Sequence, residues 1–172
     1  MKLSTKLAAG DALPALTIPR LGGGDICPAT GGQWQLFVVY RGKHCPLCKT
    51  YLKTLDGLIE EFAEIGVSIA VASGDPVQKA AADVQEHGWR FPVGYGMSVD
   101  QMKALGLYIS DPRPQETDRP FAEPGLFLIN PQGQLQIIDI SNAPFARPDL
   151  NGILRGVKLI QERQYPIRGT LA

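Results

Sequence analysis

Two cysteines, Cys45 and Cys48, are the side chains in this sequence best suited to do chemistry. They directly follow the apolar run 34–40, which predicts a buried strand, and they precede an amphipathic stretch that predicts a helix. A Cys-x-x-Cys motif at a strand-to-helix junction is typical of redox pairs that alternate between dithiol and disulfide. The sequence therefore predicts thiol–disulfide chemistry at residues 45–48.

Pro46 defines the geometry that we expect of this pair. Proline is favoured at the first helical position, where its missing N–H group would have no partner inside the helix. With Pro46 there, Cys45 is the N-cap and Cys48 the third helical residue. An N-cap side chain accepts a hydrogen bond from a helical N–H group, and the helix dipole adds positive charge. We therefore expect Cys45, as the exposed end of the pair, to be the attacking thiolate and Cys48 to resolve the mixed disulfide.

Two cationic residues, Arg41 and His44, precede the pair. Arg41 could stabilise a thiolate or steer an anionic substrate, or it could simply be solvated. His44 could accept a proton or lower a thiol pKa, or its side chain could point outward from the strand end. Cys27 is expected to be a buried apolar residue rather than a resolving thiol.

Metal and nucleotide cofactors are not expected. Only His44 and Cys27 could add ligands to the pair, and no second Cys-x-x-Cys motif completes a tetrahedral zinc site. The glycine-rich segments 22–24 and 31–32 lack the spacing of nucleotide-binding loops and predict turns.

The composition narrows the classes of partner. The chain has 172 residues, with 17 Lys plus Arg and 17 Asp plus Glu, and it has no basic run, so nucleic acid is not an expected partner. No segment reaches the roughly 20 apolar residues of a membrane helix, and the N-terminus lacks the apolar region of a signal peptide. We therefore expect a cytoplasmic protein that does not bind membranes.

The order of predicted elements indicates an α/β protein. We expect one domain over residues 1–172, with residues 1–33 forming a loop or hairpin extension packed on its edge. The expected elements are strand 34–40, helix 46–65, strand 67–72, a helix capped by Asp75 and ending at Gly88, strand 91–95, a short helix from Ser98 to Leu105, a proline-rich loop 111–124, strands 125–130 and 135–140 joined as a hairpin, and a helix from Pro148 to Arg163. With the Cys-x-x-Cys motif at the first strand-to-helix junction, this order predicts a thioredoxin-like fold with a central mixed β-sheet flanked by helices.

Three segments resemble the AhpC/TSA peroxiredoxin-like families of the thioredoxin superfamily. They are residues 39–48 (VYRGKHCPLC), 124–133 (PGLFLINPQG) and 142–148 (NAPFARP). The resemblance implies a thiol-based oxidoreductase of cell redox homeostasis, whose partners are a thiol or disulfide substrate protein, a small thiol reductant or a peroxide. Members of these families often dimerise, so the resemblance also admits a homodimer.

Peroxiredoxins carry the motif Pro-x-x-x-Thr-x-x-Cys, whose cysteine attacks the peroxide. When this chain is aligned on that motif, Cys48 takes the peroxidatic position, Cys45 replaces the threonine and Arg41 replaces the proline. Three functional hypotheses remain. We favour a thiol–disulfide oxidoreductase that cycles Cys45 and Cys48. The alternatives are a hydroperoxide reductase with Cys48 peroxidatic and Cys45 resolving, and a redox-sensing interaction protein.

Two further residues bear on these readings. Pro124 stands where the peroxiredoxins place an arginine, and the resemblance to thioredoxin-like oxidoreductases implies that it is a cis-proline facing the cysteine pair. Arg147 precedes the last helix, where arginine is a poor cap, so we expect it to serve function or to form a tertiary salt bridge.

Overall fold

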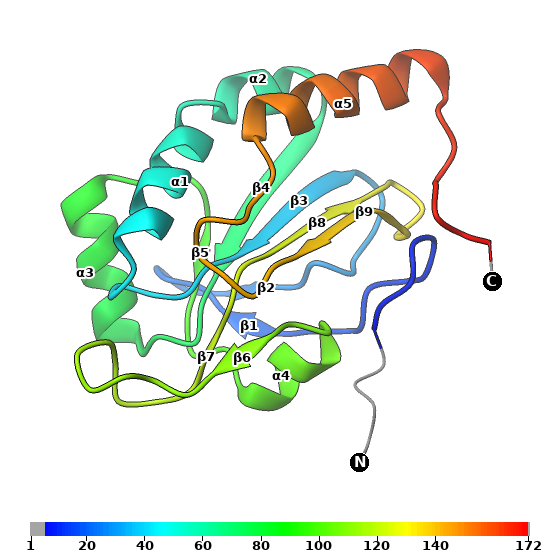
Figure 1. The fold of residues 1–172 in the computed structure, drawn as a ribbon. Coiled ribbons are helices and arrows are strands. Elements are labelled where there is room, and N and C mark those ends of the chain that lie inside the picture. The colour runs from blue at the N-terminus through cyan, green and yellow to red at the C-terminus, as the bar shows by residue number, and fades with distance from the viewer. Residues whose placement is uncertain (1–5, 172) are drawn as a thin grey trace.

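The computed structural model describes residues 6–171 and is built around a mixed sheet of five strands in the order β5-β4-β3-β8-β9 (Figure 1). β3 pairs in parallel with β4 and β4 with β5, whereas β8 is antiparallel to both β3 and β9. The strands are Trp34–Val39 (β3), Val67–Ala72 (β4), Val93–Gly94 (β5), Gly125–Ile129 (β8) and Leu135–Ile140 (β9).

Helices cover both faces of this sheet. Figure 1 places α1, α2 and α5 over one face, and α4 with the β1–β2 hairpin over the other. The helices are Pro46–Asp56 (α1), Ile59–Glu64 (α2), Val77–His87 (α3), Val99–Ala104 (α4) and Leu150–Arg163 (α5), and the two small hairpins are Ile18–Pro19 (β1) with Asp25–Ile26 (β2), and Ile109–Ser110 (β6) with Phe121–Ala122 (β7). The architecture confirms the predicted thioredoxin-like α/β fold with an N-terminal hairpin.

The side chains of β3 divide the core into two halves. Alternate residues of a strand point to opposite faces of the sheet. Leu36 and Val38, with Tyr40 directly after the strand, accordingly belong to the apolar cluster beneath α1, α2 and α5, whereas Phe37 and Val39 belong to the cluster on the α4 side. Because β3 is buried on both faces, the chain that leaves its end at residue 40 starts from a fixed position.

The N-terminal segment adds to the β5 edge of the sheet. Leu21 N donates to Val93 O at 2.9 Å, and Tyr95 N donates to Pro19 O at 3.0 Å.

No helix within residues 6–171 has both the length and the apolar character required to cross a membrane.

Several predicted boundaries were wrong for local reasons. The helix predicted over 46–65 is interrupted at Gly57 and Leu58, which separate α1 from α2. The helix near residue 76 has Pro76 and not Asp75 at its N-cap, because the Asp75 carboxylate is used elsewhere. The last helix begins at Leu150, after an Asp149 cap. The predicted Gly88 stop and the Ser98–Gln101 capping box are confirmed.

Candidate active site

The N-cap geometry predicted for the cysteine pair is confirmed. Cys45 occupies the N-cap of α1 in an extended conformation, and Pro46 follows at the first helical position. The backbone N–H of Cys48 donates to Cys45 Sγ at 3.2 Å. One sulfur therefore terminates the helix while the other lies on its first turn, which brings the two thiols together.

This geometry separates the acidities of the two thiols. Hydrogen bonding from the Cys48 side chain is the main cause that lowers the pKa of Cys45 to about 6, against an opposing effect of burial, and the Cys48 N–H, Arg41 and Arg147 lower it further. Burial raises the pKa of Cys48, and its hydrogen bond to Cys45 raises it again. The pair therefore carries its negative charge on Cys45.

Both sulfur-bearing residues are buried, which corrects one expectation. Cys45 is 1% exposed and Cys48 is 0% exposed, so Cys45 is not the exposed end of the pair. The N-cap position was expected to face solvent, but the chain between β9 and α5 brings Arg147 against the same sulfurs. A substrate therefore reaches Cys45 only through a narrow approach or after a local movement.

Arg147, for which the sequence left open a functional role or a tertiary salt bridge, lies against the cysteine pair. Its Nη2 lies 2.9 Å from Cys48 Sγ and 3.9 Å from Cys45 Sγ. Its Nε donates to Pro144 O at 2.8 Å, and its guanidinium lies 4.9 Å from the centre of the Tyr51 ring. The sequence signal was an arginine at a poor capping position, and its tertiary partners are the two thiol sulfurs.

Arg41 is held by acidic residues and is not a freely solvated side chain. Its Nε lies 3.0 Å from Glu123 Oε2, its Nη2 lies 3.5 Å from Glu116 Oε1, and its side chain is 14% exposed. The guanidinium also lies 4.8 Å from the centre of the Phe121 ring. Glu116, Phe121 and Glu123 all belong to the region predicted as loop 111–124, so this region forms one wall of the site and holds a cation that lowers the pKa of Cys45.

His44 lies beneath the same wall. Its ring packs edge-on against Phe121, with the ring centres 4.5 Å apart. Burial, and then the nearby Arg41 charge, lower the pKa of His44, which keeps the imidazole neutral near neutral pH. Neither ring nitrogen has a hydrogen-bond partner among residues 6–171. His44 thus packs inward, and no contact places it on the sulfurs.

The expected cis bond before Pro124 was wrong. Every peptide bond in the described part of the chain is trans, including that between Glu123 and Pro124. Glu123 and Pro124 connect β7 to β8, and their backbone groups are hydrogen-bonded to neighbouring segments. Glu123 N donates to Tyr108 O at 2.8 Å, and Pro124 O accepts from Ser141 N at 3.0 Å. Because these groups are already paired, Pro124 does not offer free backbone to a substrate peptide, although it borders a small cavity beside Arg147.

Asp75 fixes the loop that leads to Cys45. Its Oδ2 accepts from Lys43 N at 2.7 Å. Gly42 has φ of +130°, and a Cβ atom on it would lie 2.8 Å from the Asp75 carboxylate oxygens. Glycine is required here both by its backbone conformation and by this close approach. The carboxylate expected to cap a helix therefore holds the active-site loop.

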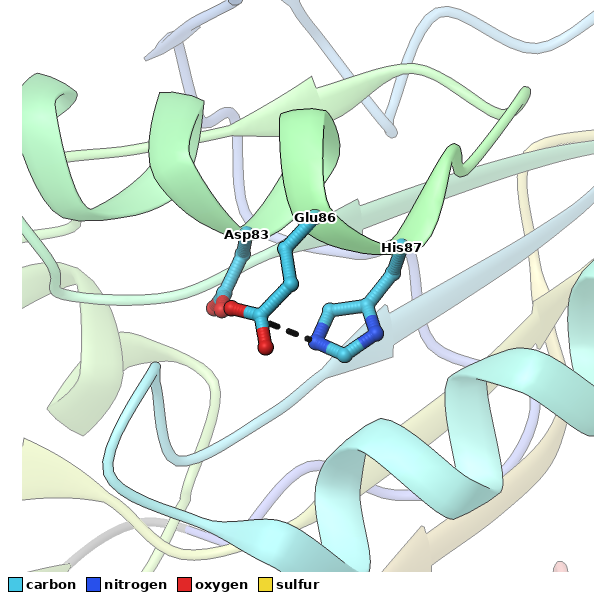
Figure 2. Close-up of side chains that lie close together, drawn as sticks. All are labelled: Asp83, Glu86 and His87. Carbon is cyan, nitrogen blue, oxygen red and sulfur yellow. Dashed lines mark ion pairs between the residues drawn. The ribbon is translucent and has the colours of Figure 1, made fainter.

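A grouping of possible metal ligands lies on α3, outside the cysteine pair. Figure 2 shows Asp83, Glu86 and His87 on one side of the helix, and their ligand atoms lie within 4.8 Å of one another. Lys43 Nζ lies 3.5 Å and Lys49 Nζ 3.8 Å from Asp83 Oδ1, and Lys43 also contacts Glu86. Because these ammonium groups already balance the carboxylates, the grouping is better described as an ionic link between α3 and the segment around the cysteines.

Comparison with known proteins decides the family. The model of the AhpC/TSA family matches residues 9–138. The chain belongs to the AhpC/TSA family. It is similar to the alkyl hydroperoxide reductase C of Escherichia coli K12, with 26% identity over 132 residues that cover 77% of this chain and 68% of that protein. The protein of the same name from Bacillus subtilis is 29% identical over 138 residues, covering 78% and 71%.

Solved peroxiredoxin structures share the fold of this AhpC/TSA member. The Peroxiredoxin 6 of Arenicola marina superimposes with a TM-score of 0.77 at 18% identity, covering 92% of this chain and 75% of that one. A peroxiredoxin-like protein from Aquifex aeolicus gives a TM-score of 0.75 at 16% identity, covering 90% and 88%. These structures confirm the fold, and the family match over residues 9–138 makes the protein a thiol-based redox protein of the peroxiredoxin family.

Proposed function

We propose that the protein is a thiol-dependent hydroperoxide reductase in which Cys45 attacks the peroxide and Cys48 resolves the product. The observation that carries this proposal is the buried Cys45 sulfur, which lies 3.9 Å from Arg147 Nη2. Its surroundings, Arg41 and Arg147 among them, lower the pKa of Cys45 to about 6. It reverses the order of preference drawn from the sequence, which placed a protein disulfide first.

Burial of the pair favours a small oxidant. A protein disulfide must bring one of its sulfur atoms into line with Cys45 Sγ, and a residue that is 1% exposed does not permit this without rearrangement. Hydrogen peroxide has only two heavy atoms and can enter where a polypeptide cannot. The Glu123 N–H and the Pro124 carbonyl, beside the trans bond, are already hydrogen-bonded and are not free to pair with a substrate peptide. The names of the curated relatives, alkyl hydroperoxide reductases, agree with this choice.

The reaction follows from the two acidities. The Cys45 thiolate attacks one peroxide oxygen, the O–O bond breaks, and the leaving oxygen departs as hydroxide or, with a proton, as water. The Cys48 thiol then attacks the sulfur of the Cys45 sulfenic acid, which releases water and forms a Cys45–Cys48 disulfide. Two equivalents of an external thiol return the pair to the dithiol and leave as a disulfide.

The Arg147 guanidinium stabilises the negative charge that develops during these reaction steps. Arg147 Nη2 donates toward the sulfurs, and Arg147 Nη1 is buried without a hydrogen-bond partner among the described residues. A donor that is already in place stabilises an oxygen on which negative charge develops, without any cost of reorganisation at that moment. Arg147 thus supplies the positive charge that the family places at the position occupied here by Pro124.

Thiol–disulfide exchange with a protein is the second candidate. It is favoured by the N-cap Cys-x-x-Cys arrangement, with its lowered Cys45 pKa. Reduced protein given equal concentrations of hydrogen peroxide and a protein disulfide such as insulin separates the two functions. We expect peroxide to be consumed first, with insulin reduced no faster than by a free small thiol. Preferential insulin reduction would contradict the proposal and favour the second candidate.

The pH dependence of the reaction follows from the Cys45 pKa. Only the thiolate attacks, so the second-order rate constant with hydrogen peroxide should rise with pH, reach half its maximum near the Cys45 pKa of about 6 and then level off. Stopped-flow measurement of thiol loss across the pH range tests this. A midpoint near the ordinary cysteine value of about 8.5 would show that the attacking thiol is not stabilised as its surroundings imply.

A further inference from the structure

Residues 141–149, here named the strap, connect β9 to α5. We propose that the strap determines which oxidants reach the cysteine pair, and that Tyr51 is the positioning residue that holds the strap closed. This inference deepens the proposed function and rests on it for the identity of the small oxidant. The strap would admit small oxidants and exclude bulky disulfides.

The strap lies against the first turns of α1, beside the cysteines. Figure 1 shows it passing from the end of β9 to the start of α5, and its Arg147 reaches both sulfurs. A groove of about 390 Å³ separates the strap from α1, between Leu47, Thr50 and Tyr51 on one side and Pro144 and Phe145 on the other. The open groove outside and the buried sulfurs inside are thus separated by the Arg147 end of the strap.

Few hydrogen bonds tie the strap to the remainder of the protein. Within the described chain, it makes hydrogen bonds to residues outside itself and α5 only near its two ends. At one end, Ser141 N donates to Pro124 O. At the other, Pro148 O accepts from the Tyr51 hydroxyl, and Arg147 donates to the two cysteine sulfurs. Phe145 is 80% exposed. A segment with so few outward hydrogen bonds and an exposed tip belongs to the low-stability part of a fold and can open locally.

Tyr51 makes two of the contacts that hold the strap. Its hydroxyl donates to Pro148 O at 2.8 Å, and its ring lies beneath the Arg147 guanidinium. It follows Cys48 by one helical turn on α1, so its position is fixed relative to the sulfurs. Burial raises the pKa of Tyr51, which keeps the hydroxyl protonated as a donor. The aromatic ring therefore orients the cation, and the hydroxyl anchors the backbone beside it.

Loosening this anchor should move two rates in opposite directions. When the strap opens, Arg147 leaves the sulfurs and the Cys45 thiolate loses part of its stabilisation, so the peroxide reaction slows. The same opening uncovers Cys45 Sγ, so a bulky disulfide reacts faster. At high pH, where Cys45 is ionised whether or not Arg147 is in place, strap-open molecules should keep the wild-type reactivity of Cys45 with small reagents. General damage to the fold would change that reactivity as well.

The experiment compares Tyr51→Phe and Tyr51→Leu with the wild type. Tyr165→Phe is the matched control, because Tyr165 is 43% exposed and lies far along the chain, after α5. The probes are methyl methanethiosulfonate, which is small, and 5,5′-dithiobis(2-nitrobenzoate), which is bulky. In each case Cys45 Sγ bonds to one sulfur of the probe and the other half departs, as a sulfinate or as an aromatic thiolate. The ratio of the bulky to the small rate cancels the amount of thiolate and reports access alone.

We expect Tyr51→Phe to raise this ratio by about 2- to 10-fold, the effect of one lost hydrogen bond on strap opening. Tyr51→Leu, which also removes the ring, should raise it further and shift the pH midpoint of the small-probe reaction upward. Tyr165→Phe should change neither. An unchanged ratio in a folded Tyr51→Phe protein would overturn the proposal. A raised ratio together with a wild type that is inert to peroxide would support the strap and contradict the hydroperoxide reductase.

Discussion

Replacing Cys45 by serine is expected to abolish the fast reaction with hydrogen peroxide. The remaining Cys48 is fully buried, and burial raises its pKa. A thiol with the ordinary pKa of about 8.5 is only about 3% ionised at pH 7. The raised pKa of Cys48 leaves even less thiolate, so we expect a rate loss of more than about 30-fold near neutral pH. Stopped-flow measurement of peroxide consumption by the reduced variant provides the test.

Cys48→Ser is the matched control for this result. It keeps the Cys45 sulfur and replaces the Cys48 thiol by a hydroxyl, which can still donate a hydrogen bond to that sulfur but cannot resolve a sulfenic acid. We expect the first step to survive and a sulfenic acid to accumulate on Cys45, where dimedone traps it for mass spectrometry. Turnover with an external thiol should fall. A Cys45→Ser protein that still reacts rapidly, with the sulfenic acid on Cys48, would reverse the roles and restore the assignment given by the family motif.

Replacing Arg147 by methionine is expected to slow the peroxide reaction by about 10- to 100-fold, the effect of losing one charge-assisted hydrogen bond of about 1.5–3 kcal/mol. Methionine fills a similar space but carries no charge and no donor. Because Arg147 also lowers the pKa of Cys45, the pH midpoint of the reaction should move upward. Rate constants measured across the pH range separate the two effects.

Two variants make this prediction specific. Arg147→Lys keeps the charge but loses the planar donor group that reaches both sulfurs, so an intermediate rate is expected. Arg155→Met removes an exposed arginine of α5 that pairs with Asp149 at 3.7 Å, and it should leave the rate unchanged. Equal losses in Arg147→Met and Arg155→Met would indicate a general electrostatic effect and remove Arg147 from the site.

Much of the fold could be predicted because its signals are local. The buried run of β4, the Gly88 helix stop and the Ser98 capping box each depend on neighbouring residues, and each is found in the structure. The predicted start of a helix was wrong where the side chain expected to cap it bonds to a residue distant in the sequence. Asp75 has the sequence context of a helix cap, but its carboxylate accepts the Lys43 N–H across 32 residues.

The candidate site divides in the same way. The N-cap position of Cys45 follows from Pro46 and the short spacing to Cys48, and it could be read from the sequence. The contact of Arg147 with the sulfurs joins positions about a hundred residues apart, so only the poor local fit of this arginine signalled it. Burial of Cys45 and the trans bond at Pro124 depend on the path of the chain through residues 121–149, which no local pattern encodes.

The most direct test of the account is a single-turnover reaction of the fully reduced protein with one equivalent of hydrogen peroxide, followed by peptide mapping. We predict that both thiols of the pair are lost at a rate far above that of a free small-molecule thiol, and that mass spectrometry finds a Cys45–Cys48 disulfide with Cys27 still reduced. A rate no greater than that of the free thiol would contradict the proposed function.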